Sequence, residues 1–249
     1  QCACEASVEC SAVERERKQA AGIELDAIWR GVRAFGRRCA EEDCIMTSRL
    51  DPGRLDPGRL DPSRLGTVIE TPRLILKVPS LKEFEPWCEF MADEDAAQYI
   101  GKAQPASVVW RNICSMVGAW QLEGFAMFSV FEKSTGRWVG RVGPWRPHQW
   151  PGNEVGWGVI RETWGKGYAL EAAVASMDFA VDVLGWTDII HSIHPNNLAS
   201  QKLAMRLGSI NRGPGQMPPP YQNDPVDLWG QTSDEWKQRR EAIWAALKR

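Results

Sequence analysis

A glycine-rich turn, Trp164-Gly-Lys-Gly-Tyr168, holds the residues of this sequence that are best suited to chemistry. A strand-like run over 154–160 precedes it, and an apolar helical pattern over 169–184 follows it. A helix that begins directly after a strand and a tight turn presents unbonded main-chain N–H groups at the positive end of its dipole, and such an end binds phosphate. The two glycines allow a ligand to approach the main chain closely, and the lysine adds positive charge. The turn therefore predicts an anionic ligand that carries a pyrophosphate.

Two common phosphate-binding motifs do not fit this turn. A P-loop requires Ser or Thr directly after its lysine, whereas Lys166 is followed by Gly167. A dinucleotide fingerprint that starts at Gly156 requires its third glycine at the position of Arg161. Gly167 therefore excludes a P-loop, and Arg161 excludes a dinucleotide fingerprint.

Two sequence blocks instead resemble a known family. Trp164-Gly-Lys-Gly-Tyr-Ala-Leu-Glu-Ala172 is similar to the pyrophosphate-binding motif of the GNAT acetyltransferases, in the branch that includes the ribosomal-protein N-terminal acetyltransferases. The second block, His194-Pro-Asn-Asn-Leu-Ala-Ser-Gln-Lys-Leu-Ala-Met-Arg-Leu-Gly208, resembles the family's Asn-x-x-Ser helix that ends in Leu-Gly. The resemblance covers residues 68–230. It implies an α/β (α+β) fold whose mixed central sheet, of about six to seven strands, is splayed at the acetyl-CoA site and flanked by helices.

Hydrophobic periodicity and turn residues place the individual elements along the chain. The apolar patterns predict helices that start from caps such as Ser80 and Ser233. The expected strands are 73–78, 125–132, 137–145, 154–160, 188–193, 210–212 and 226–229, and the expected helices are 81–91, 106–121, 169–184, a helix opened by Asn196 or Asn197 and ending at Gly208, and 234–247.

The resemblance implies a set of contacts to acetyl-CoA. The pyrophosphate would lie on the main chain of Trp164, Gly165, Lys166, Gly167, Tyr168 and Ala169. Val159 and Ile160 would offer main-chain groups to the pantetheine arm. Asn197 and Ser200, three residues apart, share one helix face and would reach the arm or the thiolate leaving group. Asn197 also fits an ordinary helix N-cap, and the two roles are compatible.

Glu154 is the candidate general base, because some members of the family carry a glutamate at the start of this strand that removes the amine proton. Ser200 is the second candidate catalytic residue. A strand-edge carboxylate with a structural partner is the alternative for Glu154. His191 and His194 are further candidate bases, each of which also fits a structural role. The sequence departs from the family at Glu162, an acidic residue beside the phosphate turn.

Two classes of function follow from this resemblance. The first is an acetyltransferase that moves the acetyl group of acetyl-CoA to a primary amine, on a protein N-terminus or a small molecule, by direct attack. The second is a catalytically inactive module that binds or senses acyl-CoA. A metal is not expected, since the cysteines that crowd the first 45 residues fit no standard zinc spacing.

The chain divides into four parts by composition. Residues 1–45 read as a helical extension upstream of Met46, which is a candidate translation start. Residues 46–67 contain a repeat of Leu-Asp-Pro-Gly/Ser-Arg, which predicts a linker or an extended arm. Residues 68–230 form the acetyltransferase domain, and 231–249 form a C-terminal helix.

The net charge and the hydropathy pattern limit the classes of binding partner that the sequence supports. The net charge of −2 gives no support for a nucleic-acid or membrane-surface partner. The sequence has neither a membrane-length apolar run nor the layout of a signal peptide, which predicts a cytoplasmic protein. A homodimer is left open.

Overall fold

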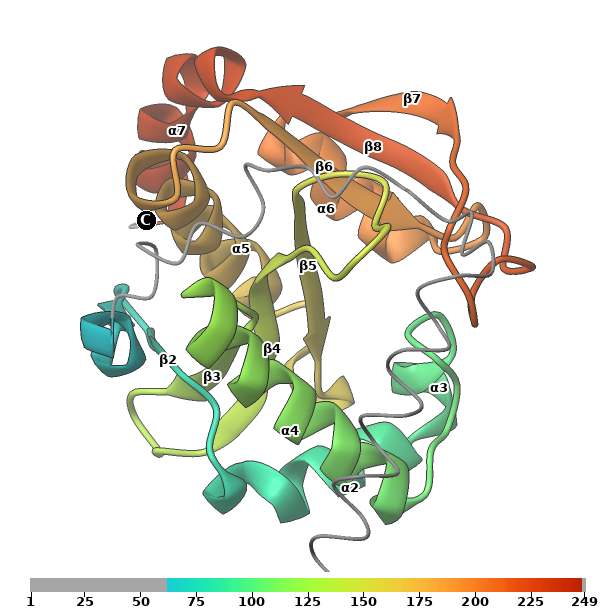
Figure 1. Ribbon diagram of the computed structural model, residues 1–249. Helices are drawn as coiled ribbons and strands as arrows, with labels where there is room; N and C mark the ends of the chain where they lie inside the picture. Colours follow the sequence, from blue (N-terminus) through green and yellow to red (C-terminus); the bar gives the residue numbers. More distant parts are fainter. Residues whose placement is uncertain (1–61, 248–249) are drawn as a thin grey trace, which may run out of the picture. The chain divides into compact units, whose positions relative to one another are not determined.

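A mixed sheet of eight strands organises residues 62–247, the part of the chain that the computed structural model describes (Figure 1). The strand order is β1-β2-β3-β4-β5-β6-β8-β7. Among these neighbours only β5 and β6 are parallel. The strands are β1 (Val68–Glu70), β2 (Leu74–Lys77), β3 (Phe128–Glu132), β4 (Trp138–Trp145), β5 (Glu154–Val159), β6 (Asp188–Ile193), β7 (Ile210–Pro214) and β8 (Asp227–Thr232).

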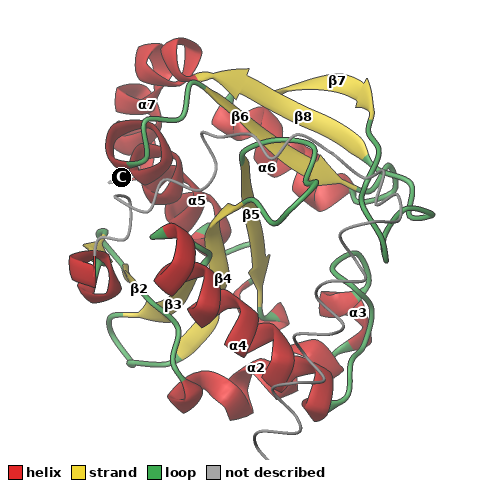
Figure 2. Cartoon of the chain, viewed as in Figure 1, coloured by secondary structure: helices red, strands yellow, loops and turns green. Residues whose placement is uncertain are grey.

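Helices cover both faces of the sheet (Figure 2). Phe90 of α2 contacts Gly158 of β5 on one face, and Trp157 of the same strand contacts α6 on the other. The helices are α2 (Phe84–Ala92), α3 (Glu94–Ala97) and α4 (Ala106–Glu123) on the first face, α5 (Tyr168–Asp178) and α6 (Leu198–Leu207) on the second, and α7 (Ser233–Leu247) beside α5.

The predicted elements are present, with local differences. The sheet gains an eighth strand, β1, because a three-residue edge strand is too short to leave a period-two pattern. The helix predicted from Leu81 begins as a 3-10 turn under a Ser80 capping box and becomes α2 at Phe84. The pattern over 169–184 forms α5 followed by a π-helical turn, Phe179–Val183.

The last copy of the Pro-rich repeat is not extended. Pro62–Gly66 forms a 3-10 helix, η2, that lies beside α4. The expectation of an extended arm is therefore wrong for these residues. The first two copies and the predicted helical extension over 1–45 lie outside the described residues.

The C-terminal helix α7 is fastened to the far end of α5. Trp236 of α7 is fully buried and donates its indole N–H to Asp178, the last residue of α5, at 2.9 Å. Trp244 and Arg240 donate to the same carboxylate at 2.7 and 3.3 Å. Three donors on one carboxylate fix both helices against each other.

The parallel pair β5–β6 is splayed. Glu154 and Ile190 are the single register pair between the two strands, and the strands diverge beyond it (Figure 1). Since β5 continues to Val159, most of its β6-facing edge lacks a neighbouring strand. The structure thus contains the predicted splay, between the predicted strands.

A buried carboxylate ties the start of the sheet to α5. Glu171 is fully buried and accepts from the Thr71 hydroxyl at 2.6 Å, from the Arg73 N–H at 2.8 Å and from Arg73 Nε at 2.6 Å. A carboxylate without solvent is costly unless several donors surround it. Glu171 therefore has a structural role, which holds the turn between β1 and β2 against the first turns of α5.

We expect Arg73→Met to lower the free energy of unfolding by about 1–3 kcal/mol, because it leaves a buried carboxylate short of a charged donor. Arg137→Met is the matched control: Arg137 and Glu162 are 3.5 Å apart and both more than half exposed, so its loss should cost less than about 1 kcal/mol. Urea unfolding of both variants is the measurement. Equal losses would show that Glu171 does not depend on Arg73.

Candidate active site

The predicted phosphate turn has the geometry of an anion site. Gly165 and Gly167 have φ of 75° and 80°, which explains glycine at both positions. Gly167 is the N-cap of α5, and no side chain caps this end. The first three N–H groups of the helix, from Tyr168 to Leu170, have no partner within it, while Glu171 is the first to bond back, to Gly167. An anion can accept from these N–H groups and from the positive end of the dipole.

Side chains from other elements hold the turn in place. Arg73 Nη1 donates to the carbonyl of Lys166 at 2.8 Å, and the Arg73 guanidinium lies 4.8 Å from the centre of the Tyr168 ring. The Tyr168 phenol donates to Glu132 of β3, which raises the pKa of the phenol. The Trp164 indole donates to the carbonyl of Val159 at 3.1 Å. These contacts set the turn in a fixed position before any ligand arrives.

The acidic residue in the turn points away from the phosphate-binding end. The Glu162 carboxylate lies 3.5 Å from Arg137, in the turn between β3 and β4. The neighbouring Arg161 pairs with Asp93 and with Asp95, 2.9 Å away, at the start of α3. The departure from the family pattern at Glu162 is thus compatible with an anion site.

The gap between β5 and β6 is bordered by main-chain groups. Ile160 donates its N–H to the carbonyl of Val139 at 3.0 Å, and its own carbonyl accepts from the 3-10 turn η4 (Arg161–Thr163). Because main-chain groups alternate in direction along an antiparallel strand, those of Trp157 and Val159 point away from β4, toward the gap. A ligand in the gap can therefore bond to Trp157 and to the N–H of Val159, whereas Ile160 is occupied within the protein.

The start of α6 borders the same gap. Asn197 is the N-cap of α6, and its side-chain oxygen accepts from the N–H of Ser200 at 3.1 Å. Ser200 Oγ in turn accepts from the indole of Trp157 on β5 at 3.1 Å. Since the indole occupies a lone pair of this oxygen, the hydroxyl keeps its own proton to donate. The structure brings Ser200 and the open edge of β5 together.

Glu154 lies at the closed end of the splay and is nearly buried, with 7% of its surface exposed. The indole of Trp150 donates to its Oε2 at 2.5 Å. Burial raises the pKa of Glu154, and hydrogen bonds from Trp150 and Ser192 and the charge of Arg141 act against that rise. A carboxylate with a raised pKa is suited to accept a proton near neutral pH.

Two aromatic side chains from separate loops lie beside Glu154. Trp150, in the loop between β4 and β5, packs edge-to-face against Tyr221, in the loop between β7 and β8, with ring centroids 6.3 Å apart. Tyr221 also raises the pKa of the buried Arg141, which places its phenol near the same group of charges. Glu154 is thus bordered by two loops that belong to different halves of the sheet.

The two strand-end histidines have structural contacts. His191 is 1% exposed, donates from Nδ1 to the Val155 carbonyl at 2.7 Å, and accepts at Nε2 from the Ser209 hydroxyl at 3.0 Å. Burial lowers the pKa of His191 to about 4. His194 accepts from the N–H of Asn196 at 3.0 Å and its ring lies 4.9 Å from that of Tyr99.

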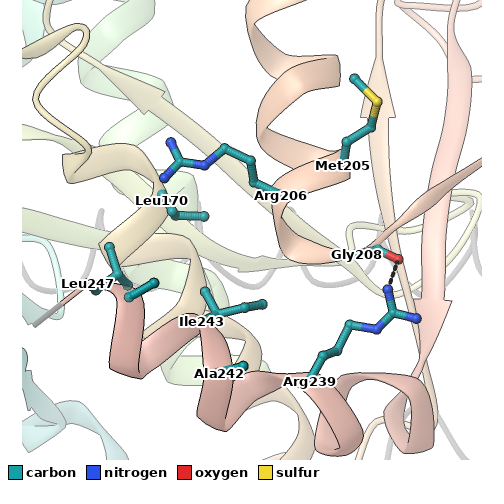
Figure 3. Close-up of a pocket in the computed structure, with 9 residues that line it drawn as sticks. Leu170, Met205, Arg206, Gly208, Arg239, Ala242, Ile243 and Leu247 are labelled. Carbon is teal, nitrogen blue, oxygen red and sulfur yellow. Dashed lines mark hydrogen bonds between the residues drawn. The ribbon is translucent and has the colours of Figure 1, made fainter. Parts of the chain in front are cut away.

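A separate pocket of about 380 Å³ lies where α5, α6 and α7 meet (Figure 3). Arg206 projects toward Leu170 in the first turns of α5, and Arg239 donates to the carbonyl of Gly208 at 3.1 Å. Its remaining lining is largely apolar. The pocket adjoins the helix whose N-terminus forms the anion site.

Sequence reasoning missed four residues of the site: Trp157, Trp150, Arg141 and Arg73. Trp157 bonds to a residue 43 positions away along the chain, and Arg73 bonds to residues 93 and 98 positions away. No local sequence pattern could therefore reveal these contacts. The unusual number of tryptophans, thirteen in the whole chain, was the available signal for the two indoles.

Residues 62–247 contain no group of three or more metal-binding side chains placed to share an ion. Within the same range, no helix has the length and the apolar character needed to cross a bilayer.

Comparison with known proteins agrees with this geometry. The family described as "Acetyltransferase (GNAT) domain" matches residues 73–210, more than half of the chain, so the chain belongs to the GNAT acetyltransferases. The uncharacterised N-acetyltransferase p20 of Bacillus licheniformis is 30% identical over 146 residues, which span 57% of this chain and 82% of that protein. The predicted family, fold class and acetyltransferase activity are confirmed.

Solved structures share the fold. An acetyltransferase from Agrobacterium tumefaciens str. C58 has a TM-score of 0.59 at 24% identity, over 67% of this chain and 95% of that one. A putative ribosomal-protein-serine acetyltransferase from Vibrio cholerae has a TM-score of 0.57 at 20% identity, over 68% and 98%. Members of the family use acetyl-CoA as cosubstrate.

The pKa of His191 makes stability depend on pH. In the unfolded chain the imidazole binds a proton near pH 6.5, but in the folded protein only near pH 4, so the free energy of unfolding falls as pH drops through this window. Between pH 7 and pH 5 we expect His191 to account for a loss of about 2 kcal/mol. His191→Gln should remove this component, whereas His194→Gln should leave it in place, as measured by urea unfolding at both pH values. A His191→Gln variant with the full wild-type loss would contradict the assignment.

Proposed function

We propose that the protein transfers acetyl from acetyl-CoA to a primary amine by direct attack, with Glu154 as general base. The observation that carries this proposal is the arrangement along β5: a carboxylate of raised pKa at one end, an open main-chain edge in the middle, and an uncapped helix N-terminus beyond the other end. Acetyl-CoA carries an acyl group, an amide-containing arm and a pyrophosphate in the same order.

The proposed contacts to acetyl-CoA use main-chain groups that have no hydrogen-bond partner within the described residues. Within the turn from Trp164 to Ala169, the N–H groups of Trp164 and Lys166 already donate to the carbonyls of Arg161 and Thr163, so the pyrophosphate lies on the N–H groups of Gly165 and of Gly167 to Ala169, with the Lys166 side chain adding charge. The pantetheine amides bond to Val159 and to Trp157, which replaces Ile160 because the main chain of Ile160 is occupied. The contribution of Ile160 is then limited to its side chain. Asn197 acts by fixing the start of α6.

The chemical step needs one base and one proton donor. The amine nitrogen attacks the thioester carbonyl, and Glu154 takes the proton that the nitrogen loses, through Oε1, since Oε2 is bonded to Trp150. The carbon–sulfur bond then breaks, and a hydrogen bond from the Ser200 hydroxyl stabilises the CoA thiolate. The Trp157 indole leaves the Ser200 hydroxyl free to donate.

The acceptor is a small-molecule amine or a protein N-terminus. The Vibrio cholerae relative is named as acting on a ribosomal protein, which supports the second class, while p20 is named only as an N-acetyltransferase. Cytoplasmic location and a homodimer stay predictions. Thiol release with a panel of amines tests the proposal: a chain that binds acetyl-CoA and releases thiol with none of them would be the inactive sensing module.

Gly165→Asp should weaken acetyl-CoA binding at least ~10-fold, about 1.4 kcal/mol, because it sets a negative charge against the pyrophosphate. Gly185→Asp is the matched control. Gly185 has a φ of 68°, close to the 75° of Gly165, and both positions have open space for a side chain, so the backbone strain is alike. Calorimetry of both variants separates charge from strain. Unchanged affinity in folded Gly165→Asp would remove the turn from the cofactor site.

Glu154→Gln should lower kcat roughly 10²-fold with little change in acetyl-CoA affinity. In the wild type, kcat/KM should fall as pH drops through the raised pKa of Glu154, because the base becomes protonated, and the Gln variant should lack this fall. The loss should shrink at high pH, where more of the acceptor amine is already neutral. Glu162→Gln, beside the phosphate turn, should retain the wild-type profile. Full activity in Glu154→Gln would eliminate the residue as the base.

A further inference from the structure

Arg141 of β4 is a partly buried cation that has no ion-pair partner within residues 62–247. Its Nε is buried and has no hydrogen-bond partner, and its Nη1 donates to the thioether sulfur of Met127 at 2.8 Å, which is a weak acceptor. Its guanidinium lies 5.9 Å from the ring centre of Trp87. Within residues 62–247 no carboxylate comes within ion-pair distance of it. Burial accordingly lowers the pKa of Arg141.

Other arginines of the chain contrast with it. Five of them, with side chains 25–54% exposed, each have a carboxylate partner, although an ion pair near solvent contributes little. These pairs are Arg73–Glu171, Arg137–Glu162, Arg161–Asp93, Arg212–Asp188 and Arg240–Asp182. A buried guanidinium needs such a partner far more, because its unmet donors are costly without water.

Arg141 and Glu154 lie on the same face of the sheet. In the β4–β5 register Arg141 is opposite Gly158, and Glu154 is opposite Trp145, an even number of residues away, so both side chains project from one face. The one position of β5 between them on this face is Gly156, and the residue opposite Arg141 is Gly158. Both charged groups therefore extend over a stretch of β5 that has no side chains of its own.

Met127 places the two groups next to each other. Its sulfur accepts from Arg141, and its methyl group lies 2.6 Å from the position that a Cβ on Gly156 would take. Oε1 of Glu154 lies 3.1 Å from that same position. The two charged groups are thus more than ion-pair distance apart, and Met127 contacts Arg141 and lies beside Glu154.

From this arrangement we infer that the acceptor is a small amino acid, whose amine is bound at Glu154 and whose carboxylate is bound by Arg141. The inference rests on the acetyl transfer and the role of Glu154 proposed above. A carboxylate supplies the acceptor oxygens that the guanidinium lacks, and Arg–carboxylate pairs are strong and directional. A protein N-terminus, in which the carboxyl is a neutral amide, would leave Arg141 unpaired.

The test compares each amino acid with its own amide, which differs in the carboxylate alone: glycine with glycinamide and 4-aminobutyrate with 4-aminobutyramide. We expect the wild type to favour at least one acid over its amide, in kcat/KM corrected for the fraction of neutral amine, by about 10-fold or more. Arg141→Met should abolish that preference, and Arg141→Lys should retain part of it. Arg212→Met, which removes a paired arginine at the sheet edge, should keep the preference.

The ratio of kcat/KM for the acid to kcat/KM for the amide shows whether Arg141 binds the substrate carboxylate or only affects Glu154. If Arg141 only adjusts the charge of Glu154, its loss slows both substrates equally and the ratio stays constant, which would overturn the inference. Wild-type enzyme that prefers the amides would overturn it too, even if Arg141→Met failed to fold.

Failure of the proposed acetyl transfer has a different signature. If no amine releases thiol, calorimetry of the CoA-loaded protein with N-acetylglycine decides the inference alone. Binding that Arg141→Met abolishes would support the carboxylate site, and absence of binding would overturn it.

Discussion

The separation of β5 from β6 after one register pair is the constraint on which the rest of the structure depends. Ordinary parallel strands would satisfy each other's main-chain groups over their full length. Here Glu154 and Ile190 form the single register pair, and the main-chain groups of Trp157 and the N–H of Val159 are left for another partner. The protein keeps the two halves of the sheet together by other means, chiefly the contact from the Trp157 indole to Ser200 and the packing of that ring against His191, 4.8 Å away.

The buried polar groups of the second half support this geometry. His191 accepts from Ser209 and donates to Val155, so it links β6 to β5 just beyond the last register pair. Gln231 of β8 donates to the same Ser209 hydroxyl at 3.0 Å. The bond to Val155 crosses between β6 and β5 where the sheet opens, and the other two bonds join β6 and β8 to Ser209, the residue just before β7. Ser209, which stands where the family often has an apolar or aromatic residue, is thereby explained by its partner on β6.

Local sequence patterns predicted much of the fold and the cofactor end of the site. The glycines of the phosphate turn need positive φ, and the Asn-x-x-Ser block is a helix cap, so both signals are contained within a few residues. The catalytic end was less predictable. Burial of Glu154 depends on Trp150 and on strands that pair across the sheet, and the unpaired state of Arg141 depends on the absence of neighbours. A short sequence pattern cannot show that a side chain such as Arg141 lacks an ion-pair partner in the folded protein.

The attachment of α7 to Asp178 has a consequence for the far end of α5. Asp178 lies where α5 passes into the π-helical turn, and the donors from Trp236, Trp244 and Arg240 offset the charge of its carboxylate. The same helix presents its other end to the anion site. The last fifteen-residue helix, Ser233–Leu247, thus holds the helix that begins at the proposed phosphate-binding turn. Tags or fusions at the C-terminus would act on acetyl-CoA affinity by mechanical transmission along α5, with no change in any residue that contacts the ligand.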